Sequence, residues 1–319
     1  MRILFFGTPE FAKNVLCALA ASEYKNDIIG VVTREDKPKD RGHKLMPPPV
    51  KVAAEKLGYP VYQPQTLKEE SFGETFRTLA PDLCIVVAYG KILPHYVLFE
   101  PKFGAINVHG SLLPKYRGAA PFQRAIMAGE KEIGVTIMKM DDGVDTGDML
   151  AKAAVPVMPE TTCGDIENEL SEKGSALLTD VVRALGTDKY PPEKQDDSLS
   201  TYAKKIDGED RIIDFSQSAD ICSQRIRALS PVPLAVTDID GVPVKITRAV
   251  TADGKSTGEA GTVSELFAKG DGRITVNCGE GRLTILRLVP QGKNEMSAGD
   301  FIRGRKINEN SILGKGENK

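Results

Sequence analysis

Two polar residues, Asn107 and His109, interrupt an otherwise apolar stretch of this sequence. One residue separates them, so on a β-strand both side chains lie on the same face. Gly110 and Ser111 follow directly and would end the strand with exposed backbone. The pair suits acyl transfer, because an amide can donate to a developing oxyanion and an imidazole can exchange a proton. A histidine that is simply hydrogen-bonded at a strand end would give the same pattern, and both interpretations stay open on these residues alone.

An acidic, glycine-broken loop at 141–148 follows another predicted strand. Its Asp145, flanked by small residues, can fix the tautomer and stabilise the charge of His109 if both lie at one sheet edge. The loop does not have the spacing of an EF-hand calcium site and lacks its distant bidentate glutamate. A solvated acidic turn is the alternative. The three histidines and five cysteines of the chain are scattered, so we expect no metal site.

Alternating strands and helices are predicted to position these residues. Apolar runs at 2–6, 27–33, 83–89, 104–109 and 133–140 predict buried strands. Helical patterns lie at about 9–19, 50–57, 122–127 and 163–185. The order predicts an α/β fold with a doubly wound, mostly parallel, Rossmann-like sheet that binds ligands at the carboxyl ends of its strands. The loop 7–12 lacks the Gly-x-Gly-x-x-Gly spacing, which disfavours a nicotinamide-dependent dehydrogenase.

The chain changes character after residue 185. Residues 186–200 hold turn formers and charges with almost nothing to bury, which predicts a linker. Beyond it, a helix at about 216–229 precedes short strands separated by tight turns, at 234–239, 242–250, 260–264, 273–278 and 282–289. This pattern predicts a small antiparallel barrel. The length of 319 residues fits two domains, which we place at 1–188 and 207–319 with a linker at 189–206.

Composition limits the possible partners. The formal net charge is -2, which excludes a broadly basic protein that coats DNA, and the absence of Trp argues against wide base stacking. The segment 34–51 is locally basic, with six Lys or Arg against three Asp or Glu, and suits either phosphate contacts or a solvated loop. No apolar run suits a signal peptide or a spanning helix, and the scattered cysteines suggest reduced thiols. We therefore expect a cytoplasmic protein that contacts no membrane.

Several longer segments resemble one known family. The segments 107–118 and 142–148, which contain the residues above, are similar to the folate-dependent formyltransferases. Within that family, the segments 7–12, 42–47, 87–94 and 202–206 are most similar to members that act on methionyl-tRNA. The resemblance covers nearly the whole chain. It departs from the family at Val232, between two prolines, where relatives often carry Trp.

The resemblance implies a doubly wound catalytic domain followed by an OB-like, tRNA-binding barrel. It implies formyl transfer from 10-formyltetrahydrofolate, a co-substrate, to the α-amine of methionyl initiator tRNA, without a metal. We further expect a monomer that does not bind DNA. The residues that it implicates fall into three groups. The catalytic group is Asn107, His109 and Asp145; the folate contacts are Ser111, Leu112, Leu113 and Pro114, with Val86, Val87, Ala88 and Tyr89 at the pterin; and the tRNA contacts are Arg41, Lys44, Lys37 and Lys39.

Other functions remain compatible with these residues. A formyltransferase acting on a sugar-nucleotide amine or on a purine precursor would share the Asn-x-His and Asp pattern but differ in the loop at 34–49 and usually lack the second domain. A non-catalytic RNA-binding protein could keep the barrel and a degenerate first domain. The intact Asn107, His109 and Asp145 argue against that reading.

Overall fold

The computed structural model describes residues 1–39, 44–304 and 307–314. The chain forms two compact units. The first comprises Met1–Pro121, Ile133–Val155 and Glu167–Ala203, and the second comprises Phe122–Glu132, Pro156–Ile166 and Lys204–Lys319. The second unit therefore includes two short segments of the N-terminal half. Among the described residues, no helix is both long and apolar enough to cross a membrane.

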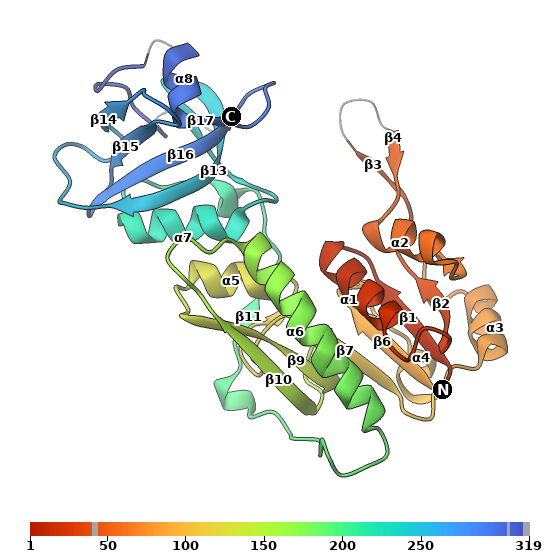
Figure 1. The fold of residues 1–319 in the computed structure, drawn as a ribbon. Helices are drawn as coiled ribbons and strands as arrows, with labels where there is room; N and C mark the ends of the chain where they lie inside the picture. The colour runs from red at the N-terminus through yellow and green to blue at the C-terminus, as the bar shows by residue number, and fades with distance from the viewer. Residues whose placement is uncertain (40–43, 305–306, 315–319) are drawn as a thin grey trace. The chain divides into compact units, whose positions relative to one another are not determined.

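The first unit is built on a seven-stranded sheet in the order β10-β9-β7-β6-β1-β2-β5 (Figure 1). The pairs β1/β2, β1/β6, β2/β5 and β6/β7 are parallel, whereas β7/β9 is antiparallel. The predicted mostly parallel sheet is thus confirmed, with β9 and β10 added at one edge. The strands are β1 (Ile3–Gly7), β2 (Ile28–Val32), β5 (Val61–Tyr62), β6 (Leu83–Val87), β7 (Ala105–His109), β9 (Glu132–Lys139) and β10 (Met149–Pro156).

Helices pack on both faces of this sheet. On one face, α3 and α4 bury Phe72, Phe76 and Val97 in a cluster with the strand residues Leu4 and Cys84. On the other face lie α1 and most of α6, which are neighbours in Figure 1 and are joined by a hydrogen bond from Asn14 to Ser171. The helices are α1 (Glu10–Ala21), α2 (Pro49–Leu57), α3 (Glu70–Leu79), α4 (His95–Phe99) and α6 (Cys163–Arg183).

Two short strand pairs fall where the sequence predicted irregular chain. The polar stretch 34–49 contains β3 (Lys37–Lys39) and β4 (Lys44–Met46), which pair antiparallel. The predicted linker contains β11 (Tyr202–Ala203), which pairs in parallel with β8 (Arg117–Gly118), and a 3₁₀ turn, η1 (Asp197–Leu199). The end of the linker is therefore attached to the first unit, because backbone groups at 117–118 supply hydrogen bonds that the local sequence does not reveal.

The second unit is a mostly antiparallel sheet in the order β12-β13-β16-β15-β14, with β17 beside β16. Its core joins Ile226 and Leu229 of α7 to Ile246, Ile274 and Ile285 of the strands. The strand predictions are confirmed within a few residues, but the predicted barrel is not. In the described residues β12 and β14 end the sheet without pairing with each other. The elements are α5 (Pro121–Met127), η2 (Glu209–Arg211), α7 (Ala219–Leu229), β12 (Ala235–Ile239), β13 (Val242–Ala252), β14 (Val263–Phe267), β15 (Arg273–Asn277), β16 (Arg282–Pro290), β17 (Met296–Ser297) and α8 (Ala298–Gly304).

Candidate active site

Strand β7 delivers the predicted asparagine and histidine to the carboxyl end of the sheet. A Cβ built on Gly174 of α6 would lie 3.7 Å from Val108, so Val108 faces that helix. Asn107 and His109 therefore face the opposite side, as alternation along a strand requires. Both side chains are buried, with exposures of 7% and 5%. Because the imidazole is buried, its ring nitrogens have few possible partners, and these partners set its tautomer and orientation.

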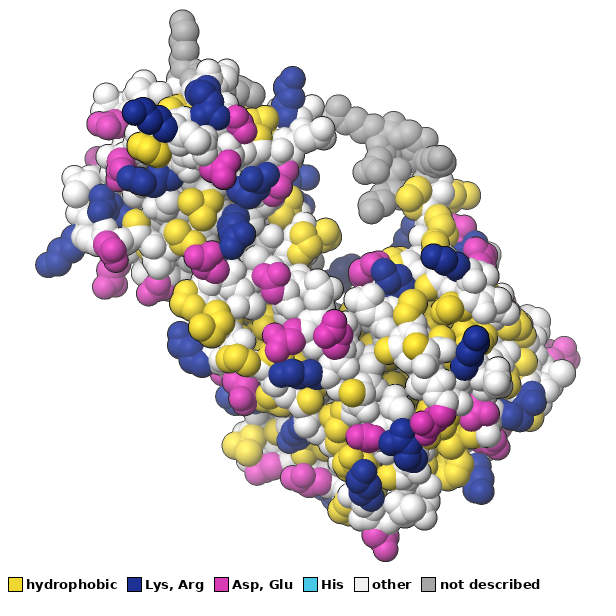
Figure 2. Space-filling model, in the orientation of Figure 1, with side chains coloured by type: hydrophobic (Ala, Val, Ile, Leu, Met, Phe, Trp, Pro, Cys, Tyr) yellow, Lys and Arg dark blue, Asp and Glu magenta, His cyan; other side chains and the backbone are white. Residues whose placement is uncertain are grey.

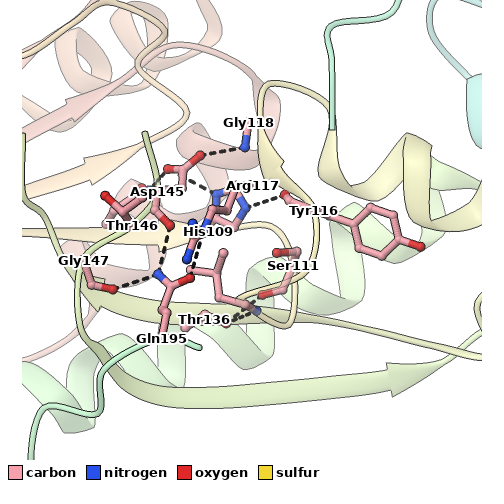
Figure 3. A network of polar contacts seen from close by, with 12 residues as sticks. His109, Ser111, Tyr116, Arg117, Gly118, Thr136, Asp145, Thr146, Gly147 and Gln195 are labelled. Atoms are coloured by element: carbon pink, nitrogen blue, oxygen red, sulfur yellow. Dashed lines mark hydrogen bonds and ion pairs between the residues drawn. The ribbon is translucent and has the colours of Figure 1, made fainter. Parts of the chain in front are cut away.

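The acidic loop between β9 and β10 brings Asp145 to the same place (Figure 3). Asp145 Oδ1 lies 3.6 Å from His109 Nδ1 and 3.4 Å from Asn107 Nδ2, which donates to it. The other oxygen, Oδ2, accepts a hydrogen bond of 2.8 Å from the Gly118 N–H. The structure thus brings together the three residues predicted as the catalytic group, and it shows a carboxylate facing one nitrogen of the imidazole.

The second nitrogen of His109 fixes the tautomer. His109 Nε2 lies 2.9 Å from the backbone oxygen of Tyr116. A carbonyl oxygen only accepts, so Nε2 must carry the proton in this hydrogen bond. In the neutral imidazole this leaves the lone pair on Nδ1, next to Asp145. The arrangement can accept a proton at Nδ1 and stabilise the resulting imidazolium with the neighbouring carboxylate.

The turn 111–114 is tied to β9 by one hydroxyl. Thr136 Oγ1 donates to the backbone oxygen of Ser111 (2.7 Å) and accepts from the Leu113 N–H (3.1 Å). Ser111 Oγ in turn donates to the backbone oxygen of Lys115 at 2.6 Å. Leu113 is buried in a small apolar cluster with Met138 and Met149, whereas Leu112 and Pro114 are partly exposed. The predicted folate-contacting turn is therefore hydrogen-bonded to β9 and within itself, and its Leu113 is packed in the core.

The predicted pterin residues end strand β6. Val86 and Val87 are buried, and Ala88 is exposed with a left-handed backbone (φ 45°). The Tyr89 ring packs edge-on against Phe6, with 5.5 Å between ring centroids. Among the described residues the Tyr89 hydroxyl has no hydrogen-bond partner, and burial raises the pKa of this phenol above its usual range. The Tyr89 ring is thus part of the core, and Ala88 is the exposed residue of this segment.

The basic segment is described only in part. Lys37 is exposed, and Lys39 and Lys44 lie on strands β3 and β4. Arg41 lies outside the described residues, as do the side chains of Lys39 and Lys44. Lys51, counted in the same basic segment, forms an ion pair of 2.9 Å with Asp36. The predicted tRNA contacts therefore stay a prediction.

Several residues of the site were not predicted from the sequence. Gly118, with φ 114°, supplies the N–H to Asp145, and Thr136 holds the turn. Gln195, from the predicted linker, donates to the backbone oxygens of Asp145 (2.9 Å) and Gly147 (2.8 Å). The positions of Gly118 within the resembling motif and of Thr136 on a predicted strand were visible, but no local signal marks Gln195. Within the described ranges, no group of three His, Cys, Asp or Glu side chains is arranged to hold a metal ion.

The fold and site define a class: a doubly wound α/β protein with an amide, an imidazole and a carboxylate gathered at the carboxyl ends of its strands, equipped for acyl transfer. The family comparison makes the class specific. A formyl transferase model matches residues 1–182, and a formyl transferase C-terminal domain model matches residues 205–306. The chain belongs to the formyl transferase family.

Solved structures of low sequence identity share the fold. HypX from Aquifex aeolicus in complex with tetrahydrofolic acid is 17% identical with a TM-score of 0.62, over 95% of this chain and 47% of that one. An N-formyltransferase from Helicobacter canadensis, in complex with folinic acid and dTDP-3-aminofucose, is 19% identical with a TM-score of 0.60, over 89% and 98%. Methionyl-tRNA formyltransferase from Clostridium thermocellum is 19% identical with a TM-score of 0.54, over 80% and 95%. The chain spans about half the length of the HypX chains that it matches.

Proposed function

We propose that this protein transfers the formyl group of 10-formyltetrahydrofolate to the α-amine of methionyl initiator tRNA. The observation that carries the proposal is the cluster of Asn107, His109 and Asp145 in a member of the formyl transferase family. Two similar structures hold folate compounds, and a third is a methionyl-tRNA formyltransferase. Three of the segments that resemble enzymes acting on methionyl-tRNA lie in the first family match, and the fourth, 202–206, reaches the start of the second. All five cysteines are free thiols, which is compatible with a cytoplasmic enzyme.

The edge of the site fits a folate. A pterin is flat and apolar on its faces, with hydrogen-bonding groups around its rim. Leu112 and Pro114 of the turn are partly exposed and offer apolar side chains, and Leu113 of the same turn packs in a buried apolar cluster with Met138 and Met149. The backbone at 86–89 and 111–114 ends strands at the same sheet edge and offers polar groups to the rim. We assign the pterin to this edge.

Each residue of the cluster has a task in the reaction. The amine attacks the formyl carbon, so negative charge develops on the formyl oxygen while the amine becomes acidic. Asn107 uses one N–H toward Asp145 and keeps the second for that oxygen. His109, held with its proton on Nε2 by Tyr116, accepts the amine proton at Nδ1 directly or through a water. Asp145 stabilises the imidazolium that results. The tetrahedral intermediate then collapses, the bond between the formyl carbon and N10 breaks, and the imidazolium returns its proton to N10, which leaves as tetrahydrofolate.

The acceptor is assigned by the basic segment and the resemblance. We assign Lys37, Lys39, Arg41 and Lys44 to phosphates near the acceptor end of the tRNA. Figure 2 shows basic and acidic side chains interspersed on the visible face of each unit, which suits local rather than general binding of RNA. Such phosphate contacts predict that binding weakens steeply as salt rises.

A comparison of three acceptors, each assayed separately, tests the proposal. The enzyme is incubated with 10-formyltetrahydrofolate and either methionyl initiator tRNA, a nucleotide-linked amino sugar or glycinamide ribonucleotide, and formylated product is measured. We expect formylmethionyl-tRNA, and loss of nearly all of it in His109→Ala and Asp145→Ala variants that bind folate normally. Formylation of the sugar or of the ribonucleotide alone would contradict the tRNA assignment and keep the formyl transfer. A variant Arg41→Ala should lose tRNA use while keeping its folate affinity.

A further inference from the structure

One half-buried side chain stands out in the exposed segment that follows β10 and α6. Residues 191–199 are exposed with a single exception, Gln195. The segment is hydrogen-bonded to other parts of the first unit at both ends. At its start, Glu193 and Met149 exchange two backbone hydrogen bonds of 2.8 and 2.9 Å. At its end, Thr201 accepts the Tyr116 N–H at its hydroxyl (2.8 Å). The predicted linker therefore contacts the start of strand β10 and the turn that carries Tyr116, whose backbone oxygen binds His109.

Every polar atom of the Gln195 side chain forms a hydrogen bond (Figure 3). Its amide nitrogen donates to the backbone oxygens of Asp145 and Gly147, at 2.9 and 2.8 Å. Its amide oxygen accepts from Arg117 Nε at 3.0 Å. Arg117 precedes Gly118, whose N–H binds the carboxylate of Asp145. One amide thus joins the backbone of the aspartate to the strand that holds its side chain.

The backbone of Asp145 needs such support. Its φ of 55° lies in the left-handed region, which residues with a Cβ rarely adopt and which persists only where surroundings impose it. The two backbone oxygens bound by Gln195 belong to Asp145 and Gly147, the neighbours of Thr146. One amide therefore fixes the conformation of the loop on both sides of Thr146. The carboxylate itself is held by the Gly118 N–H and by a longer contact of 3.4 Å from Asn107, whereas Gln195 holds the backbone that carries it.

We infer that Gln195 is a positioning residue, which sets the carboxylate of Asp145 against Nδ1 of His109. It contacts no reacting atom and acts through the loop 145–147 and Arg117. The expected effect on the reaction rate rests on the proposed function, because Gln195 positions Asp145 beside His109, the pair proposed to take the amine proton. Its structural consequence, the placement of Asp145 beside His109, is independent of which amine is the acceptor.

Two variants and a matched control isolate this role. Gln195→Met removes all three hydrogen bonds at similar length. Gln195→Glu keeps an acceptor for Arg117 but, as a carboxylate, cannot donate to the two backbone oxygens. The control Asp197→Ala changes the same segment and removes the ion pair of 2.7 Å between Arg117 and an aspartate that is 83% exposed.

The first measurement is steady-state formylation of methionyl-tRNA. In both Gln195 variants we expect kcat to fall about 10- to 100-fold, the usual consequence of a displacement of about 1 Å at a reacting group, with KM for 10-formyltetrahydrofolate within about twofold of wild type. The control should keep the wild-type kcat. Unchanged kcat with a lowered Tm would make Gln195 a structural residue only and overturn the inference, as would a loss in Gln195→Met that Gln195→Glu does not share.

The second measurement needs no acceptor. The chain has three histidines, so the ring nitrogens of His109 can be assigned in a ¹⁵N spectrum from the signals lost in His109→Ala. We expect the Nδ1 resonance to move in both Gln195 variants and to stay in Asp197→Ala. An unmoved Nδ1 resonance would overturn the inference. If wild-type enzyme does not formylate methionyl-tRNA, the proposed function fails, while this spectrum still decides the role of Gln195.

Discussion

Replacing Asp145 with Asn tests the central step of the proposed reaction, the stabilisation of protonated His109. The substitution keeps the shape of the side chain and an oxygen that can accept the Gly118 N–H, so the loop should stay in place. What it removes is a negative charge 3.6 Å from His109 Nδ1. At that separation a unit charge pair is worth about 1 kcal/mol in water and about 5 kcal/mol at the effective dielectric constant of a protein surface.

These two interaction energies set the range of the expected change in kcat. Asp145 is 16% exposed, so its interaction with the imidazolium lies between the two values. Each 1.36 kcal/mol changes the rate tenfold, and we therefore expect kcat of Asp145→Asn to fall by about 10- to 1,000-fold. Single-turnover transfer of labelled formyl to methionyl-tRNA measures the step without product release.

Asp142→Asn is the matched control, since it makes the same chemical change on an exposed residue of the same loop. It should react at the wild-type rate. If Asp145→Asn binds 10-formyltetrahydrofolate and transfers formyl within twofold of wild type, the carboxylate does not stabilise the imidazolium and the assignment of Nδ1 as the proton acceptor is wrong.

Three further predictions follow from particular contacts. Asn107→Ala should lower kcat by about 100- to 1,000-fold in the same assay, as the loss of an oxyanion donor does, with little change in folate affinity. Gly118→Ala would place a Cβ 2.8 Å from the Tyr202 ring at a φ of 114°, so we expect a loss of about 1–3 kcal/mol in urea unfolding and a lowered kcat; unchanged values would show that the β8/β11 pairing adapts freely. Hydrogen bonds from Arg124 hold the pKa of Asp210 at about 2, below its ordinary 3.8. Its stabilisation is therefore present above pH 4 and lost as pH falls toward 2, so the destabilisation of Asp210→Asn should shrink from about 2 kcal/mol at pH 7 to about half of that at pH 3 in denaturant titrations.

The strands could be predicted because burial on both faces makes them continuously apolar. β1, β6 and β7 fall within about two residues of their predicted positions. Strand β10 was missed, since most of its residues are half-exposed or exposed, and so was α3, which buries only Phe72, Gly73 and Phe76. Closure of the second sheet was predicted wrongly because tight turns specify which neighbours pair, whereas closure depends on two strands far apart in the sequence.

Some residues of the site could likewise be predicted from the sequence, and others could not. Spacing alone placed Asn107 and His109 on one face of a strand, and the acidic loop at the next strand end suggested Asp145 as the partner. The backbone oxygen of Tyr116, which fixes the histidine tautomer, could not be predicted because it depends on backbone conformation rather than on residue type. Gln195 lies 50 residues from Asp145 in a polar segment, where nothing local distinguishes it from its solvated neighbours.

Backbone strain explains why these distant contacts belong to the site. Ala88, Tyr116 and Asp145 adopt left-handed φ values of 45°, 60° and 55°, each of which costs on the order of 1–3 kcal/mol in a residue with a Cβ. Each is next to a long-range hydrogen bond: the Thr8 hydroxyl binds the backbone oxygen of Tyr89, Thr201 holds Tyr116, and Gln195 holds Asp145. The strained conformations turn the Tyr116 carbonyl toward Nε2 and the Asp145 carboxylate toward Nδ1. The imidazole is thus contacted on both sides by loops with left-handed residues, and backbone conformation in these loops, as well as residue type, sets which ring nitrogen faces the carboxylate.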